Sequence, residues 1–154
     1  MMSVTFDTAN NNDIAELVRL RIAYITDDYG SVSENDKHAM EEQLPGYFEK
    51  MLGKNLIAFV ARADGRLVAT AYLLIIEKPA NPSMQNGFVG EVLSVYTEKE
   101  YRGQGISTRL MNDVVNYAKK NNLCNIDLKA TEESIHFIQR LVLRKEIINI
   151  RIFD

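Results

Sequence analysis

The spacing of apolar positions predicts a strand and then a helix at the start of the chain. Residues 4–7 alternate between apolar and polar side chains, as an edge strand does. Residues 10–13 are asparagine and aspartate, which cap helix N-termini, and apolar positions then recur at helical spacing over residues 14–25. The helix should end near Gly30, because glycine takes the left-handed conformation that terminates many helices.

A second helical pattern runs from Ser33 to Leu52. Pro45 and Gly46 lie inside it, and a proline in a helix removes one backbone hydrogen bond and crowds the preceding turn. We therefore expect two short helices in this segment.

Extended apolar segments fill the middle of the chain. Residues 56–63 and 67–76 are joined by Asp64 and Gly65, a pair typical of tight hairpins, so the two segments should form antiparallel strands. Residues 78–87 are rich in proline, asparagine and glycine and should form a loop.

Strands and helices alternate in the rest of the chain. Residues 89–97 are rich in β-branched and aromatic side chains and predict a strand, and one apolar face makes the segment from Ile106 onward an amphipathic helix. A strand over residues 125–130, a helix over 131–143 and a final strand over 146–153 should follow.

The turn before the amphipathic helix is a candidate phosphate site, and it reads Arg-Gly-Gln-Gly-Ile-Ser over residues 102–107. The first N–H groups of a helix lack intrahelical acceptors, and glycines let a pyrophosphate approach the backbone closely. A P-loop would need a lysine followed by serine or threonine after Gly105, and a Rossmann turn would need a third glycine near Thr108; neither is present. A plain turn without a ligand is the remaining alternative.

Composition narrows the class of protein. The chain has 154 residues, 46% hydrophobic and 25% charged, which suits one domain over residues 1–154. A net charge of -3 offers nucleic acid no attraction. Cys124 is the single cysteine, so no intrachain disulfide can form. We expect a cytoplasmic protein without a membrane segment, a metal site or a nucleic-acid partner, and the sequence leaves a homodimer open.

Residues 94–130 resemble a known family. The pattern R-x-x-G-x-G/A between an apolar strand and an amphipathic helix is similar to the acetyl-CoA signature of the GNAT superfamily of N-acetyltransferases, with Ser107 at its final position. The stretch VYTEKEYRGQGI resembles the V-Y-T-x-P-E-Y-R-x-x-G-I of a bacterial subgroup, with Lys99 in place of the usual proline.

The resemblance implies a fold and a cofactor. The fold is α/β, a GNAT-type mixed, mostly antiparallel twisted sheet with helices on both faces, in the order β-α-α-β-β-β-α-β-α-β. The cofactor is acetyl-CoA, whose pantetheine would lie between the diverging strands at residues 89–97 and 125–130. The implied cofactor-binding residues are Val95, Tyr96, Thr97, Arg102, Gly103, Gln104, Gly105, Ile106, Ser107 and Thr108.

The implied reaction is the attack of an amine on a thioester. A lysine-like amine has a pKa of about 10.4, so it needs a general base at neutral pH. Glu91, at the start of the strand beside the cleft, is the candidate base, and a solvent-facing or salt-bridged glutamate is the alternative. A backbone N–H near Tyr96 would stabilise the oxyanion.

Four side chains in the N-terminal half fall in the segment that lines the acceptor site in this family. They are Tyr24, Asp28, Tyr47 and Phe48. Core packing explains Tyr47 and Phe48 equally well.

The last family motif departs from its pattern. L-x-A-T-x-x-G-x-x-L-Y-E-K-x-G-F falls over residues 128–143, and Ile138 replaces the tyrosine that protonates or hydrogen-bonds the departing CoA thiolate in the family. Two functions therefore stay open. The first is transfer of an acetyl group from acetyl-CoA to a primary amine of a small molecule, peptide or protein. The second is a catalytically impaired GNAT-like domain that acts as an acyl-CoA-binding or regulatory module.

Overall fold

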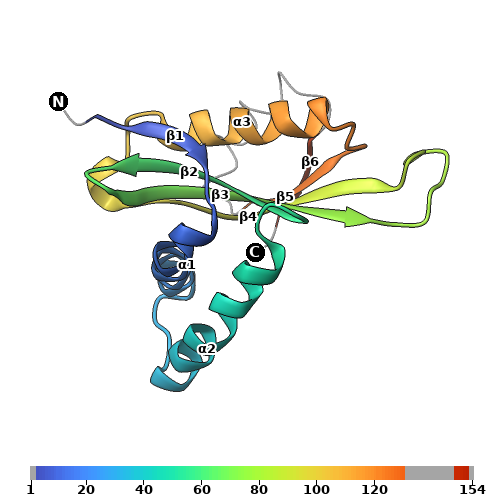
Figure 1. The fold of residues 1–154 in the computed structure, drawn as a ribbon. Helices are drawn as coiled ribbons and strands as arrows, with labels where there is room; N and C mark the ends of the chain where they lie inside the picture. The colour runs from blue at the N-terminus through green and yellow to red at the C-terminus, as the bar shows by residue number, and fades with distance from the viewer. Residues whose placement is uncertain (1–2, 131–147, 153–154) are drawn as a thin grey trace.

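One twisted sheet of six strands organises the part of the chain that the structure describes (Figure 1). The structure is a computed structural model, and it describes residues 3–130 and 148–152. The strands, in their order across the sheet, are β1 (Thr5–Thr8), β2 (Leu56–Ala63), β3 (Arg66–Glu77), β4 (Phe88–Thr97), β5 (Ile126–Ala130) and β6 (Ile148–Ile152). Strands β1 to β4 pair antiparallel, whereas β5 is parallel to β4 and β6 is parallel to β5.

Helices cover both faces of this sheet. They are α1 (Ile14–Tyr29), α2 (Glu34–Met51) and α3 (Ile106–Lys120), with the short 3-10 turns η1 (Asn11–Asp13) and η2 (Lys99–Tyr101). Figure 1 shows α1 and α2 on one face and α3 on the other. The predicted α/β fold, with a mostly antiparallel sheet between helices, is confirmed.

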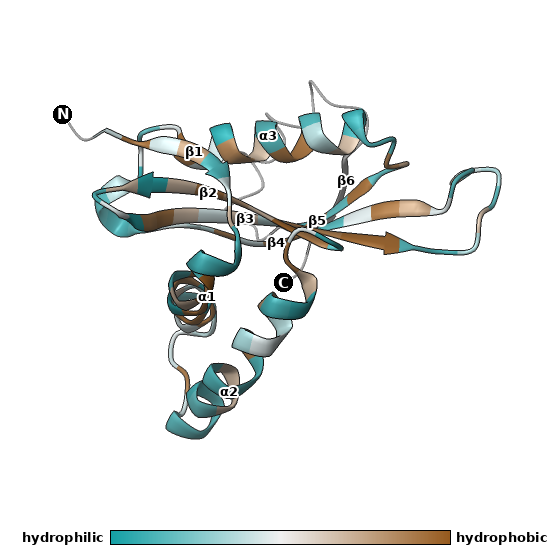
Figure 2. Ribbon diagram, viewed as in Figure 1, coloured by the Kyte–Doolittle hydropathy of each residue, from teal (hydrophilic) through white to brown (hydrophobic). Residues whose placement is uncertain are grey.

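Each face of the sheet buries its own apolar cluster. Leu110, Val114 and Ala118 of α3 are fully buried against one face, and Leu17 of α1 and Phe48 of α2 are fully buried against the other. Figure 2 shows the hydrophobic side of α3 turned toward the strands and its hydrophilic side turned outward. Each face of the sheet thus packs against an apolar layer. Among the described residues of strands β1 to β5, the buried polar side chains are Thr70, Ser94 and Thr97.

The 3-10 turn η1, which leads directly into α1, follows the predicted capping pattern. The Asn10 side chain accepts a hydrogen bond from the Asn12 N–H at 2.8 Å, and the Asp13 carboxylate accepts one from the Asn10 N–H at 2.9 Å. Asp13 is also ion-paired with Arg62 on β2, and hydrogen bonds from that guanidinium hold the pKa of Asp13 below its usual range. Gly30 ends the helix with φ of 82°, as expected.

The expectation of two short helices around Pro45 is wrong, because α2 is one helix through that proline. Leu44 and Phe48 flank Pro45 and are both buried against α1 and the sheet. Burial of two large side chains on successive turns offsets the hydrogen bond that Pro45 removes. Pro45 and Gly46 themselves are exposed, so the helix breakers face solvent.

Replacing this proline should stabilise the protein. We expect Pro45→Ala to raise the free energy of unfolding by about 1–3 kcal/mol, because alanine restores the missing N–H and proline is about 3 kcal/mol less favourable inside a helix. Urea denaturation checks this. An unchanged or lower free energy of unfolding would mean that α2 needs the proline to seat Leu44 and Phe48.

The end of the chain is described only in part. The predicted final strand is confirmed as β6. The predicted helix over residues 131–143, and Ile138 within it, lie outside the described residues.

Candidate active site

Strand β4 changes register near its middle. Tyr72 of β3 pairs with Leu93 and Thr70 pairs with Tyr96, so Ser94 and Val95 together face the single residue between Thr70 and Tyr72. Ser94 has φ of 50°, and its carbonyl accepts a hydrogen bond from the Thr70 hydroxyl at 2.8 Å. This bulge turns the second half of β4 relative to the first.

Strands β4 and β5 pair over a short length only. The pairs join Gly90, Glu91 and Val92 to β5, and the residues from Leu93 to Thr97 have no β5 partner among the described residues. The Glu98 N–H donates to Val68 on the β3 side at 2.9 Å. Backbone groups alternate along a strand, so those of Val95 and Thr97 point to the open edge and those of Tyr96 point to β3. The open edge is suited to bind an extended ligand.

The glycine turn presents unsatisfied donors at the start of α3. Gly103 and Gly105 both have φ of 78°, a conformation that favours glycine. Gly105 provides no side-chain cap, and the first turn of α3 contains no acidic residue. The Arg109 N–H is the first to bond back into the helix, to the Gly105 carbonyl at 3.0 Å. The three N–H groups before it are therefore available to an anion.

A cavity of about 590 Å³ lies where the glycine turn meets the open edge of β4. Its walls are Val95, Thr97, Tyr101, Arg102, Gly103, Gly105, Ile106, Ser107 and Thr108. Every predicted cofactor-binding residue except Tyr96 and Gln104 lines it. Tyr101 is the addition, and it is a buried side chain in the apolar layer beneath α3.

Arg102 joins the glycine turn to two other elements. Its Nε donates to the Thr97 carbonyl at 2.8 Å, and its Nη2 lies 3.4 Å from the Asp27 carboxylate at the end of α1. The Thr97 and Ser107 hydroxyls are hydrogen-bonded at 2.7 Å. These contacts fix the turn against the end of β4.

Tyr96 lies on the opposite face of the sheet from the cavity. Its ring meets Tyr24 of α1 edge to face at a centroid distance of 6.2 Å, and the Arg102 guanidinium lies 5.6 Å from its centroid. Burial raises the pKa values of Tyr24 and Tyr96, so both phenols stay protonated at neutral pH. Tyr96 therefore packs β4 against α1.

A second, smaller cavity lies on that same face. It has a volume of about 180 Å³ and is lined by Arg21, Gln43, Leu44, Tyr47, Phe48, Tyr72 and Leu93. Two of the predicted acceptor residues, Tyr47 and Phe48, line it; Phe48 is also fully buried, with its ring against Tyr72.

The other two predicted acceptor residues lie elsewhere, and two cavity residues were missed. Tyr24 meets Tyr96 edge to face and lies beside the cavity residue Arg21, whose guanidinium is 5.8 Å from the Tyr24 ring centroid. Asp28 is exposed near the end of α1. The sequence did not single out Arg21 or Tyr72. A charged residue on the apolar stripe of α1 was the available signal for Arg21, and Tyr72 carried none.

Glu91 stands on β4 just before the bulge and is partly exposed. Within the described residues its carboxylate makes no hydrogen bond and no ion pair. Burial raises the pKa of Tyr47, which lines the small cavity; the positive charge of Arg21 lowers this pKa and the negative charge of Glu91 raises it. The carboxylate is therefore not engaged in a structural ion pair with the described part of the chain.

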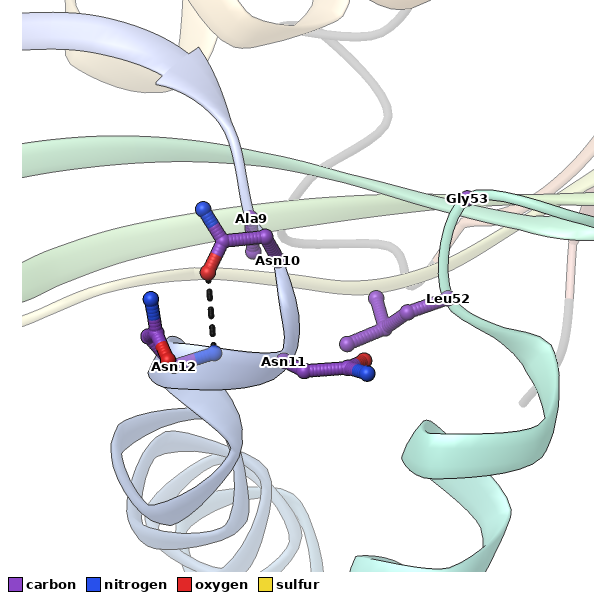
Figure 3. Close-up of a pocket in the computed structure, with 6 residues that line it drawn as sticks. All are labelled: Ala9, Asn10, Asn11, Asn12, Leu52 and Gly53. Carbon is purple, nitrogen blue, oxygen red and sulfur yellow. Dashed lines mark hydrogen bonds between the residues drawn. The ribbon is translucent and has the colours of Figure 1, made fainter.

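A third hollow, drawn in Figure 3, shares none of its described lining residues with either cavity. It has a volume of about 390 Å³ and is lined by Ala9, Asn10, Asn11, Asn12, Leu52 and Gly53. Figure 3 shows the Asn10 side chain bonded to the Asn12 backbone, which is the cap of η1. This hollow adjoins a capping motif and has no charged side chain in its lining.

Two kinds of site are absent from residues 3–130 and 148–152. No cluster of three or more histidine, cysteine, aspartate or glutamate side chains there could hold a metal ion. No helix among these residues is long and apolar enough to cross a membrane.

Solved structures share this fold. A predicted acetyltransferase from Clostridium acetobutylicum, solved with acetyl-CoA, is 27% identical, with a TM-score of 0.81 over 90% of this chain and 88% of that chain. A GCN5-related N-acetyltransferase from Ralstonia eutropha JMP134 is 20% identical, with a TM-score of 0.71 over 90% and 91% of the two chains. An aminoglycoside acetyltransferase from an uncultured soil metagenomic sample is 20% identical, with a TM-score of 0.70 over 99% and 97%.

Sequence comparison agrees with this likeness in fold. No curated protein matches the sequence. The model of the acetyltransferase (GNAT) family matches residues 19–141, which include most of α1, the β4 bulge and the glycine turn. This chain therefore belongs to the acetyltransferase (GNAT) family, a family of acetyl-CoA-dependent N-acetyltransferases.

Proposed function

We propose that this chain, as one domain over residues 1–154, transfers an acetyl group from acetyl-CoA to a primary amine of a small molecule or peptide. The observation that carries the proposal is the 590 Å³ cavity at the uncapped N-terminus of α3. It combines free helical N–H groups for a pyrophosphate with the open edge of β4 for an extended chain.

The residues present fit acetyl-CoA. A Cβ at Gly103 or Gly105 would meet no atom within 4 Å, so both positions face open space beside the helix N-terminus. The N–H groups of Ile106, Ser107 and Thr108 would hold phosphate oxygens, and the backbone of Val95 and Thr97 would hold the pantetheine. When bound, acetyl-CoA supplies an acetyl thioester.

Groups of this chain would then accept the proton of the acceptor amine and stabilise the negative charge that develops on the thioester oxygen. Glu91 would accept the proton that the acceptor ammonium loses. The expected oxyanion donor near Tyr96 becomes the Val95 N–H in this proposal, because strand alternation turns the Tyr96 amide toward β3.

One sequence feature favours the second function, an impaired domain that binds acyl-CoA. Ile138 occupies the position at which the family pattern has the tyrosine that protonates or hydrogen-bonds the departing thiolate. Calorimetry with acetyl-CoA, and a thiol-release assay with a panel of amines, separate the two functions. Binding with turnover supports the transferase, binding without turnover supports the module, and no binding overturns both.

Restoring the family tyrosine should accelerate the reaction. We expect Ile138→Tyr to raise thiol release about 10- to 100-fold, because one hydrogen bond to a developing charge contributes about 1.5–3 kcal/mol. The native enzyme should still turn over, since a thiol with a pKa of about 8.5 leaves without full protonation. A fast native enzyme that Ile138→Tyr slows would show that another group already supplies the proton.

A further inference from the structure

The 180 Å³ cavity on the α1 and α2 face is lined by a cation, Arg21, that has no ion-pair partner in the part of the chain that the structure describes. Arg21 lines this cavity and is partly buried. Within the described residues its guanidinium makes one hydrogen bond, from Nη1 to the Ser94 hydroxyl at 2.6 Å, and no ion pair. A guanidinium has five N–H donors arranged as a fork. The Arg21 guanidinium also lies 5.8 Å from the centroid of the Tyr24 ring. Its N–H groups other than the one bonded to Ser94 have no hydrogen-bond acceptor among the described residues.

Tyr72 lines the same cavity and has an unsatisfied hydroxyl. The side chain is 3% exposed, and its hydroxyl has no hydrogen-bond partner among the described residues. Buried hydroxyls nearly always have a partner, and an exception needs an explanation. A ligand oxygen held by Arg21 would provide one, because Arg21 and Tyr72 line the same cavity.

The opposite charge lies close by. Tyr47 lines the cavity. Burial raises its pKa, the positive charge of Arg21 lowers it and the negative charge of Glu91 raises it. Glu91 and the cavity residue Leu93 are two residues apart on β4 before the bulge, so both side chains lie on the same face of the sheet. A ligand in the cavity therefore has Arg21 in its lining and the Glu91 carboxylate on the same side of the sheet. A molecule with an anionic group and an amine complements that pair.

We propose that the acceptor amine also carries an anionic group, a carboxylate or a phosphate, which Arg21 binds with its fork while the Tyr72 hydroxyl donates to the same group. This inference rests on the proposed acetyl transfer and specifies its acceptor. Guanidinium binds both carboxylate and phosphate through two parallel hydrogen bonds. The amine of the same molecule would lie toward Glu91.

The size of the cavity limits the acceptor. Its volume of about 180 Å³ is below the roughly 300–1,000 Å³ of pockets that enclose drug-sized ligands. It fits a molecule or a terminal group of a few heavy atoms. A small amino acid or a short aminoalkyl phosphate meets the limit.

Matched acceptor pairs test the inference. We would measure kcat/KM for an α-amino acid and its carboxamide, and for an aminoalkyl phosphate and the parent amino alcohol. The anionic member of at least one pair should be favoured about 10- to 100-fold, mainly through KM. The pair with the larger ratio identifies carboxylate or phosphate as the group bound.

Variants of Arg21 give the decisive comparison. Arg21→Gln should bring the ratio within a pair to about one, and Arg21→Lys should retain part of it, because lysine keeps the charge and loses the fork. Replacing Arg21 also removes its hydrogen bond to Ser94 in the β4 bulge. Any loss of activity that follows from this affects both members of a pair equally, so it does not change their ratio of kcat/KM. Lys50→Gln removes an exposed charge from α2 outside the cavity and should keep the native ratio.

Two outcomes would overturn the inference. One is a native ratio near one in both pairs, and the other is a native ratio that Arg21→Gln leaves unchanged. If no amine is acetylated, the proposed transfer fails and binding alone decides: calorimetry of the same four compounds should show tighter binding of an anionic member, lost in Arg21→Gln. Equal affinities within both pairs would then contradict the inference by itself.

Discussion

Glu91→Gln should lower turnover at neutral pH by about 10²- to 10⁴-fold and leave acetyl-CoA affinity unchanged. The amide keeps the shape of the side chain and cannot accept a proton from an ammonium group. The Glu91 carboxylate is free of hydrogen bonds and ion pairs within the described residues, so the substitution should cost little stability. Thiol release at saturating acetyl-CoA measures the loss.

The pH profile distinguishes a base from a merely structural glutamate. The defect should shrink as pH rises toward the acceptor's own pKa of about 10.4, because more of the amine is then already deprotonated. Glu77→Gln, on an exposed glutamate at the end of β3, is the matched control and should behave as native. An unchanged rate for Glu91→Gln from pH 6 to pH 9 would return Glu91 to the structural interpretation.

Local patterns explain why most of the fold was predictable. Asp64 and Gly65 both have positive φ, at 51° and 75°. These two adjacent residues therefore specify the tight turn between β2 and β3. The cap of η1, just before α1, and the glycine turn before α3 are equally local. Most of the predicted cofactor-binding residues line one cavity for this reason, since they are almost contiguous in the chain.

Tertiary contacts explain what the sequence did not reveal. The bulge at Ser94 contains no glycine; it is held by Arg21 and Thr70, which lie 73 and 24 residues away in the chain. The continuity of α2 depends on the burial of Leu44 and Phe48. The expectation that a proline breaks a helix takes no account of such tertiary contacts. The small cavity draws on α1, α2, β3 and β4 at once, so no single stretch of sequence carried it.

The glycine turn gives the other large expected effect: Gly105→Asp should weaken acetyl-CoA binding by at least about 100-fold. Aspartate tolerates the left-handed conformation at φ of 78° better than most residues, so the strain is about 1 kcal/mol. Its Cβ would meet no atom within 4 Å, and its carboxylate would occupy the site of the pyrophosphate. Losing two charge-assisted hydrogen bonds costs about 3 kcal/mol or more. This corresponds to the increase of at least about 100-fold in the acetyl-CoA dissociation constant that calorimetry should measure.

Two controls separate the effect of the introduced charge on acetyl-CoA affinity from the effect of backbone strain. Gly65→Asp puts the same side chain at φ of 75° in the hairpin between β2 and β3, again with no atom within 4 Å of the Cβ, and should leave acetyl-CoA affinity at the native value. Gly105→Asn matches the shape of aspartate without its charge, so it should weaken binding less than Gly105→Asp does. If Gly105→Asp binds acetyl-CoA as tightly as the native protein, the N-terminus of α3 does not hold the pyrophosphate.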